Sequence, residues 1–340
     1  MNAPGRNRRV IIILTGLLVL VLFVLELSSG PVSIPFVNVF KIIFGGESPD
    51  PSWPVIVMES RMPRALTSAI AGSSLALSGL LMQTLFRNPL AGPSVLGISS
   101  GASLGVALLV LSSGGLIFYK LPIAGAGIAL AAIAGSMLVL IILLSVAERL
   151  KDNTSLLIFG IMLGYFTSAV VSILQYKAGN ESLRTFVLWS MGSFAEADYY
   201  ELLIMTLLFL TSCIIVVYLL RSLDLMLLGD DYASSMGVSV RSTRFMLILA
   251  SGLLAGAVTA FAGPVAFIGL AVPHITRSVM GTSSHPRLFV PLILVGAAVG
   301  LLCDFIARMT EVPLNAVASA LGAPVIIYII IKGSKSKAII

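Results

Sequence analysis

Residues 61–105 read RMPRALTSAIAGSSLALSGLLMQTLFRNPLAGPSVLGISSGASLG, a long apolar run followed by an abrupt break. Residues 65–86 contain no charged side chain, and about 20 such residues cross the hydrocarbon core of a bilayer as a helix. The next residues, RNPLAGP (87–93), hold two prolines, which prevent a continuous helix. Irregular backbone at membrane depth is tolerated only against protein or a water-filled cavity. The break therefore predicts either a simple turn or part of the lining of a transport pathway.

Similar apolar runs recur along the whole chain of 340 residues, of which 58% are hydrophobic and 11% charged. A transmembrane β-barrel would alternate polar and apolar residues, and runs such as LAAIAGSMLVLIILLSV (130–146) do not. The sequence therefore predicts an all-α polytopic membrane protein with a single transmembrane domain over residues 1–340. About ten transmembrane helices are expected, at 10–28, 61–85, 94–112, 122–147, 154–176, 202–220, 243–260, 264–276, 288–308 and 314–332.

The distribution of basic residues predicts that both termini are cytoplasmic. With the N-terminus inside, 14 of the 21 Lys and Arg residues fall on the cytoplasmic side, as the positive-inside rule requires. The first apolar run could instead be a cleaved signal peptide, but ELSSG (26–30) lacks a small-x-small cleavage pattern, which favours a retained span. The net charge of +6 is attributed to these inner loops and not to nucleic-acid binding.

Two polar stretches exceed an ordinary turn. Residues 177–201 are predicted to be an external amphipathic segment, and residues 221–242 form a cytoplasmic loop that mixes acids with small residues. A weak internal sequence similarity is also present, because RMPR (61–64) resembles RSTR (241–244) and AGP occurs at both 91–93 and 262–264. In the expected topology the two members of each pair lie on opposite membrane faces, which is typical of a pseudo-inverted repeat.

The fifth expected span carries a polar stripe. Its members fall at positions i, i+4, i+8 and i+11, on one face of a helix. Such an uncharged stripe suits a pathway that passes a bulky solute without binding it tightly, although hydrogen bonding between helices is an alternative. The predicted pathway-lining residues are Gly164, Ser168, Ser172 and Gln175.

The stretch 61–105, together with FAGPVAFIGLAVPHITR (261–277) and EVPLNAVASALGAPVIIYII (311–330), resembles the FecCD family of permease subunits. This resemblance covers nearly the whole chain in order. It implies a type II ABC importer permease fold in the bacterial inner membrane, and a cargo that is an iron-siderophore, heme or cobalamin. It also implies three kinds of partner: a second copy of the chain, two ATP-binding cassette subunits and an external substrate-binding protein.

The resemblance also implies roles for individual residues. Arg61, Arg64 and Arg308 match the positions that dock the binding protein, although Arg308 could instead pair with Asp304 one helical turn earlier. Residues 228–237, LGDDYASSMG, resemble the loop that couples to the ATPase, with Asp where the family usually has Glu, and a solvated loop is the alternative. The coupling residues are then Asp230, Asp231, Ala233 and Gly237, and the gate positions are Asn88, Leu90, Thr154 and Ser155.

No catalytic or metal-binding residues are predicted. His274 lacks a second ligand nearby, and His285, eleven residues later, does not complete a zinc pattern. None of the lysines follows a glycine, so there is no G-x-x-x-x-G-K-[ST] phosphate loop. The chain is therefore expected to be no enzyme and to hold no cofactor, with ATP and Mg on the partner ATPase. The alternative is an ion-coupled secondary transporter working without an ATPase, which would need intramembrane charges for coupling; the deepest acids, Glu26 and Asp304, lie near helix ends.

Overall fold

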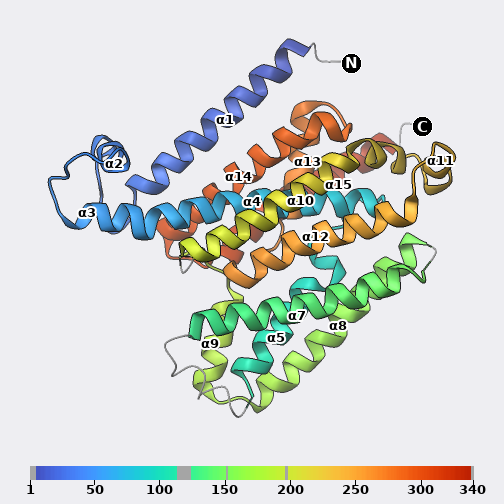
Figure 1. The fold of residues 1–340 in the computed structure, drawn as a ribbon, viewed down its shortest axis with the longest axis horizontal. Helices are drawn as coiled ribbons and strands as arrows, with labels where there is room; N and C mark the ends of the chain where they lie inside the picture. The colour runs from blue at the N-terminus through green and yellow to red at the C-terminus, as the bar shows by residue number, and fades with distance from the viewer. Residues whose placement is uncertain (1–4, 113–123, 151, 196–197, 338–340) are drawn as a thin grey trace.

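The computed structural model describes residues 5–112, 124–150, 152–195 and 198–337, which are helical throughout apart from their connections. The first half of the chain forms α1 (Gly5–Ser28), α2 (Phe36–Ile43), α3 (Ser52–Val55), the π-helical turn η1 (Ile56–Arg61), α4 (Met62–Leu85), the 3-10 turn η2 (Pro93–Leu96), α5 (Ile98–Val110), α7 (Ala124–Ala147) and α8 (Asn153–Lys177). The second half forms α9 (Asn180–Ser190), α10 (Tyr199–Met226), α11 (Asp230–Ser235), α12 (Val240–Ala262), α13 (Ile268–Met280), α14 (His285–Thr310) and α15 (Leu314–Lys337). Figure 1 shows the long helices running roughly side by side.

Seven helical segments in the described part of the chain are long and apolar enough to cross a membrane. They match seven of the expected spans, and include α1, α7, α8, α10, α12, α14 and the continuous helix that ends with α4. The other three expected spans correspond to α5, α13 and α15. The prediction of a polytopic helical protein is confirmed, but two of these three spans are not the helices that the sequence suggested.

The expected spans 94–112 and 264–276 are both broken near their start. Gly97 has a φ of 73°, so the first segment is a 3-10 turn followed by a separate α5 of 13 residues. A helix of that length is only about 20 Å long, which is too short for a typical bilayer core. In the second segment Phe267 has a φ of 66°, and α13 begins at residue 268 instead of 264. These left-handed residues stop the helix where hydropathy alone predicts that it continues.

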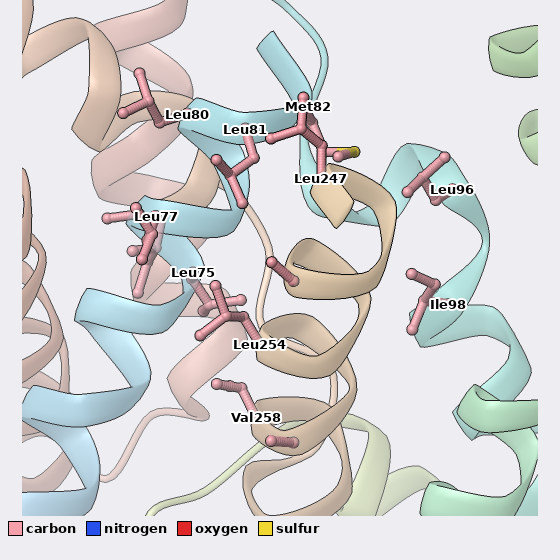
Figure 2. Close-up of a cluster of buried hydrophobic side chains, with 14 of the residues drawn as sticks. Leu75, Leu77, Leu80, Leu81, Met82, Leu96, Ile98, Leu247, Leu254 and Val258 are labelled. Carbon is pink, nitrogen blue, oxygen red and sulfur yellow. The ribbon is translucent and has the colours of Figure 1, made fainter. Parts of the chain in front are cut away.

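Helices α4 and α12 form the centre of the bundle, since most of each is buried inside the protein. Figure 2 shows their leucines packed against one another, with Leu96 and Ile98 from η2 and α5 alongside. Between them, the hydroxyls of Ser78 and Ser251 lie 2.6 Å apart. In lipid, close packing and hydrogen bonds between helices replace the hydrophobic effect as the force that holds helices together.

Glycines set the distances between several helices. A Cβ at Gly72 on α4 would lie 2.2 Å from the carbonyl oxygen of Gly296 on α14, and one at Gly105 on α5 would lie 2.0 Å from that of Ala131 on α7. Because real Cβ atoms do not approach that closely, only glycine permits these contacts. Gly97, Gly101 and Gly105 repeat at four-residue spacing, and all three lie against the backbone of a neighbouring helix, Gly97 against α8 and the other two against α7.

The packing pattern supports the expected pseudo-inverted repeat. In this comparison α4, α5, α7 and α8 correspond in order to α12, α13, α14 and α15. Helix α4 packs on α14, and its counterpart α12 packs on α7. Helix α5 contacts α7 and α8, and its counterpart α13 contacts α14 and α15. Helices α4 and α12 also run in opposite directions in Figure 1. The two AGP sequences occupy equivalent places, one shortly after α4 and the other at the end of α12.

Candidate transport pathway and coupling site

The loop expected at 221–242 is mostly helical. Helix α10 continues to Met226 and α12 begins at Val240, so only a short connection carrying α11 remains. Gly229 and Gly237 flank α11 with φ values of 122° and 85°, a region that favours glycine. Ala233 is buried while Asp231 is exposed. Figure 1 shows α11 at one end of the bundle, and most of its residues are exposed.

Asp230 is partly buried and pairs with two arginines. Its Oδ1 lies 3.1 Å from Nη2 of Arg87, and its Oδ2 lies 3.3 Å from Nη2 of Arg244. The side chain of Arg244 is 9% exposed, that of Asp230 25% and that of Arg87 42%. Of the two predicted coupling acids, Asp231 is exposed and Asp230 is partly covered by these arginines. Neither ion pair was predicted from the sequence, in which Arg244 was noted only as part of RSTR.

The predicted gate residues Asn88 and Leu90 lie in a tight turn after α4, which we call the 87–90 segment. Arg87 begins it with a φ of 46°, and the Asn88 side-chain oxygen accepts a hydrogen bond of 2.9 Å from the Leu90 N–H. His274, on α13, donates from Nε2 to the Pro89 carbonyl at 2.8 Å. The Leu90 side chain is exposed.

The predicted gate residues Thr154 and Ser155 lie in the first turn of α8, which we call the 153–155 segment. Asp152 caps this helix by accepting a hydrogen bond of 2.7 Å from the Ser155 N–H, and hydrogen bonds from Ser155 hold the pKa of Asp152 below its ordinary value. Asn153 donates from Nδ2 to the Leu85 carbonyl at 2.7 Å. This bond joins the start of α8 to the end of α4, and so places the two segments side by side. Asn153 was not predicted from the sequence, because the gate assignment covered only its neighbours Thr154 and Ser155.

The polar stripe on α8 borders an open groove of about 330 Å³. Ser168, Ser172 and Gln175 line it from α8, and Gly164 lies further along the same helix. The groove is lined further by polar and apolar side chains, namely Ser99, Ser100, Ser103, Val171, Phe186, Ser190 and Pro264. Six serines and one glutamine thus face a shared space without a charged side chain among them, an arrangement that suits weak contact with a large solute.

The segment expected to be amphipathic at 177–201 contains α9, which packs on α5. Phe186 is a buried residue of α9, and its ring centroid lies 6.0 Å from that of Trp189. Residues 196 and 197 of this segment lie outside the described part of the chain.

The three arginines expected to dock a partner lie together near the ends of α1, α4 and α14, but they are largely engaged within the protein. Arg61 is buried and donates to the carbonyls of Leu27, at 2.8 Å, and Val32. These bonds satisfy backbone groups near the end of α1 and the loop that follows. Docking by Arg61 therefore remains a prediction, and the structure gives this side chain a role within the fold.

Arg64 and Arg308 each pair with a buried carboxylate. Arg64 makes two parallel hydrogen bonds of 2.8 and 2.7 Å with Asp304, and Arg308 lies 2.5 Å from Oε2 of Glu26. The alternative pairing of Arg308 with Asp304 is wrong, because Asp304 faces α4 instead. The two deepest acids are thus both neutralised by arginines, and neither stands alone as an ion-coupling site would require.

The second histidine is structural in its contacts. His285 Nδ1 lies 2.6 Å from Asp224 Oδ1, and its Nε2 lies 2.8 Å from the Thr84 hydroxyl. Among the described residues, no group of three or more His, Cys, Asp or Glu side chains is arranged to hold a metal ion.

Comparison with known proteins gives matches along almost the full chain. The sequence model of the FecCD transport family matches residues 18–332. Among curated relatives, the hemin transport system permease protein HmuU of Yersinia pestis is 35% identical over 94% of this chain and 96% of its own length. The vitamin B12 import system permease protein BtuC of Klebsiella pneumoniae is 36% identical over 96% of this chain and 95% of its own.

The fold also matches solved structures. A chain in an inward-facing conformation, described as part of a metal-chelate type ABC transporter, superimposes with a TM-score of 0.82 and 30% identity over 95% of this chain and 99% of that one. A chain of PsaBC from Streptococcus pneumoniae superimposes with a TM-score of 0.52 at 16% identity, covering 78% of this chain and 90% of that one, which shows a likeness of fold alone.

Proposed function

Because this chain belongs to the FecCD transport family and is the permease subunit of an ABC importer, we propose that it imports a bulky iron chelate, heme or cobalamin. Two relatives, a hemin permease and a vitamin B12 permease, support this class of cargo. The uncharged polar groove along α8 supports it as well, because it offers many weak contacts and no strong one. The alternative, an ion-coupled secondary transporter, would need a buried acid without a cationic partner. In the described part of the chain, the buried acids Asp304 and Glu26 are each paired with an arginine.

The proposed transport complex contains two copies of this chain, two ATPase subunits and an external binding protein. One observation carries the ATPase contact: α11, a short helix at the end of the bundle that exposes Asp231 between two glycine hinges. We place α11 and both termini on the cytoplasmic side, in the inner membrane of a bacterium, with α9 outside. ATP binding and hydrolysis by the partner would move α11 and exchange the outward and inward states of the pathway.

Reconstitution tests this proposal directly. Proteoliposomes that contain the chain, its co-expressed ATPase and its binding protein should accumulate labelled hemin, cobalamin or ferric siderophore only when ATP is present. A catalytically inactive ATPase is the matched control, and the purified chain alone should hydrolyse no ATP. Uptake driven by an ion gradient without any ATPase would overturn the proposal in favour of the secondary transporter.

The groove on α8 can be tested separately as the pathway. Ser172→Trp would fill part of the groove. We expect it to reduce ATP-driven uptake at least about tenfold while leaving ATP hydrolysis in place, since the indole would occupy space that a large cargo needs. Thr211→Trp is the control, because Thr211 is exposed on α10 and does not line the groove. Equal uptake by both variants would contradict the assignment of the groove.

The docking role of the arginines needs an experiment that separates binding from folding. Charge reversal at Arg61, Arg64 and Arg308 should weaken binding of the external protein, but the same change also breaks the bonds to Leu27, Asp304 and Glu26. Binding affinity should therefore be measured at a temperature well below the thermal unfolding midpoint of each variant, where circular dichroism shows it to be folded. Unchanged affinity in all three folded variants would remove this assignment.

A further inference from the structure

We propose that Asp230 acts as a positioning residue that links α11 to both predicted gate segments through Arg87 and Arg244. This inference rests on the proposed function, because it assumes that an ATPase moves α11. It goes further by naming the side chains that carry that movement to the gates. Neither arginine belongs to the residues that the sequence assigned to coupling or to gating.

The first branch runs from α11 to the 87–90 segment. Arg87 is the first residue of that segment and lies 3.1 Å from Asp230 Oδ1. Its Nη1 also lies 3.6 Å from the position of a Cβ on Gly229, so the guanidinium rests over the start of α11. Arg87 has a φ of 46°, a conformation that costs energy for a residue with a side chain and persists only where the surroundings hold it. The ion pair to Asp230 is such a restraint.

The second branch runs from α11 to the start of α8. Arg244 lies 3.3 Å from Asp230 Oδ2 and also donates to the Leu150 carbonyl at 3.0 Å. Leu150 lies in the connection between α7 and α8, three residues before Asn153. One carboxylate thus contacts two arginines: Arg87 belongs to the 87–90 segment, and Arg244 holds the connection that precedes the 153–155 segment.

The geometry makes this link sensitive to small movements. Ion-pair contacts are lost beyond about 4 Å, and the two contacts of Asp230 measure 3.1 and 3.3 Å. A displacement of α11 by about 1 Å that rotation of the arginine side chains does not absorb therefore either breaks these contacts or moves the two segments with it. Because Arg244 is 9% exposed, its pair with Asp230 is poorly screened by solvent, and breaking it is unfavourable. We infer that the segments follow α11.

The test measures gate movement in the complex of the full chain with the ATPase that copurifies with it. Leu90→Cys and Thr154→Cys are introduced singly in a background with Cys213→Ser and Cys303→Ala. The readout is the change in their labelling rate by a maleimide between the nucleotide-free state and the state trapped with ATP and vanadate. In Asp230→Asn we expect this change to shrink at least about fivefold at both positions, the lower end of typical coupling between sites, while the ATPase stays bound.

Further variants separate the two branches from a general loss of structure. Arg87→Gln should abolish the response at position 90 and keep it at position 154; since Arg87 is 42% exposed, this variant should fold. Asp230→Glu should retain both responses. Glu148→Gln is the matched control, because it removes a carboxylate from an exposed pair with Arg241, outside the proposed link, and should leave both responses unchanged.

The outcomes distinguish this inference from the proposed function. If no ATPase associates with the wild-type chain, the proposed function fails. If the wild-type gates respond to nucleotide and those of Asp230→Asn respond equally, only the link through Asp230 is overturned. Loss of the response at both positions in Arg87→Gln would also overturn it, because the two branches would then not be separate.

Discussion

At the scale of single residues, the pair between Arg64 and Asp304 should be a strong contributor to stability. Asp304 is 1% exposed and Arg64 is 19% exposed. Arg64→Ala leaves the carboxylate buried without its partner, and breaking a buried pair costs about 3–5 kcal/mol. We expect a clear fall in the thermal unfolding midpoint of the purified protein, partly restored by adding Asp304→Asn. Arg241→Ala breaks only an exposed pair with Glu148 and should cost less than about 1 kcal/mol; equal losses would contradict the argument.

These same residues mark the limit of sequence reasoning at this scale. The spacing of Asp304 and Arg308 correctly places them one turn apart on a helix, but it does not reveal what lies opposite that helix. The close approach of α4 to α14 at Gly72 and Gly296 brings Arg64 to Asp304, and this contact depends on residues far away in sequence. Asp230 is a similar case. Its acidity suggested an exposed contact, whereas Arg87 from the turn after α4 and Arg244 from α12 contact its two carboxylate oxygens.

At the scale of secondary-structure elements, glycine contacts should decide whether helices pack correctly. A Cβ at Gly79 on α4 would lie 1.8 Å from the carbonyl oxygen of Gly269 on α13. Gly79→Ala must push these two helices apart, and overpacking of this kind costs about 1–3 kcal/mol. Gly16→Ala on α1 is the control, because a Cβ there meets nothing within 4 Å and alanine favours a helix. We expect only Gly79→Ala to lower the thermal unfolding midpoint, and a similar loss in both variants would refute this.

The helices themselves could largely be predicted, because hydropathy over about 20 residues follows directly from the cost of burying polar groups in lipid. The breaks could be predicted only in part. Pro89 and Pro93 predicted that the backbone is irregular around the 87–90 segment. The positive φ of Phe267 cannot be predicted from the residue type, so the start of α13 was expected four residues too early. The third span was likewise expected to begin at residue 94, four residues before α5 begins at Ile98, because the positive φ of Gly97 separates η2 from α5.

At the scale of the whole molecule, the arrangement fixes which parts must share one side of the membrane. Figure 1 shows α9 and α11 at opposite ends of the bundle, and the excess of Lys and Arg in the loops on the α11 side predicts that this side is cytoplasmic. In a background with Cys213→Ser and Cys303→Ala, Glu181→Cys on α9 should react with a membrane-impermeant maleimide in intact cells. Ser234→Cys on α11 should react only after the cells are permeabilised, which also serves as the control for expression. The reverse pattern would place α11 outside, where no ATPase can reach it, and the coupling function would then have to be abandoned together with the orientation.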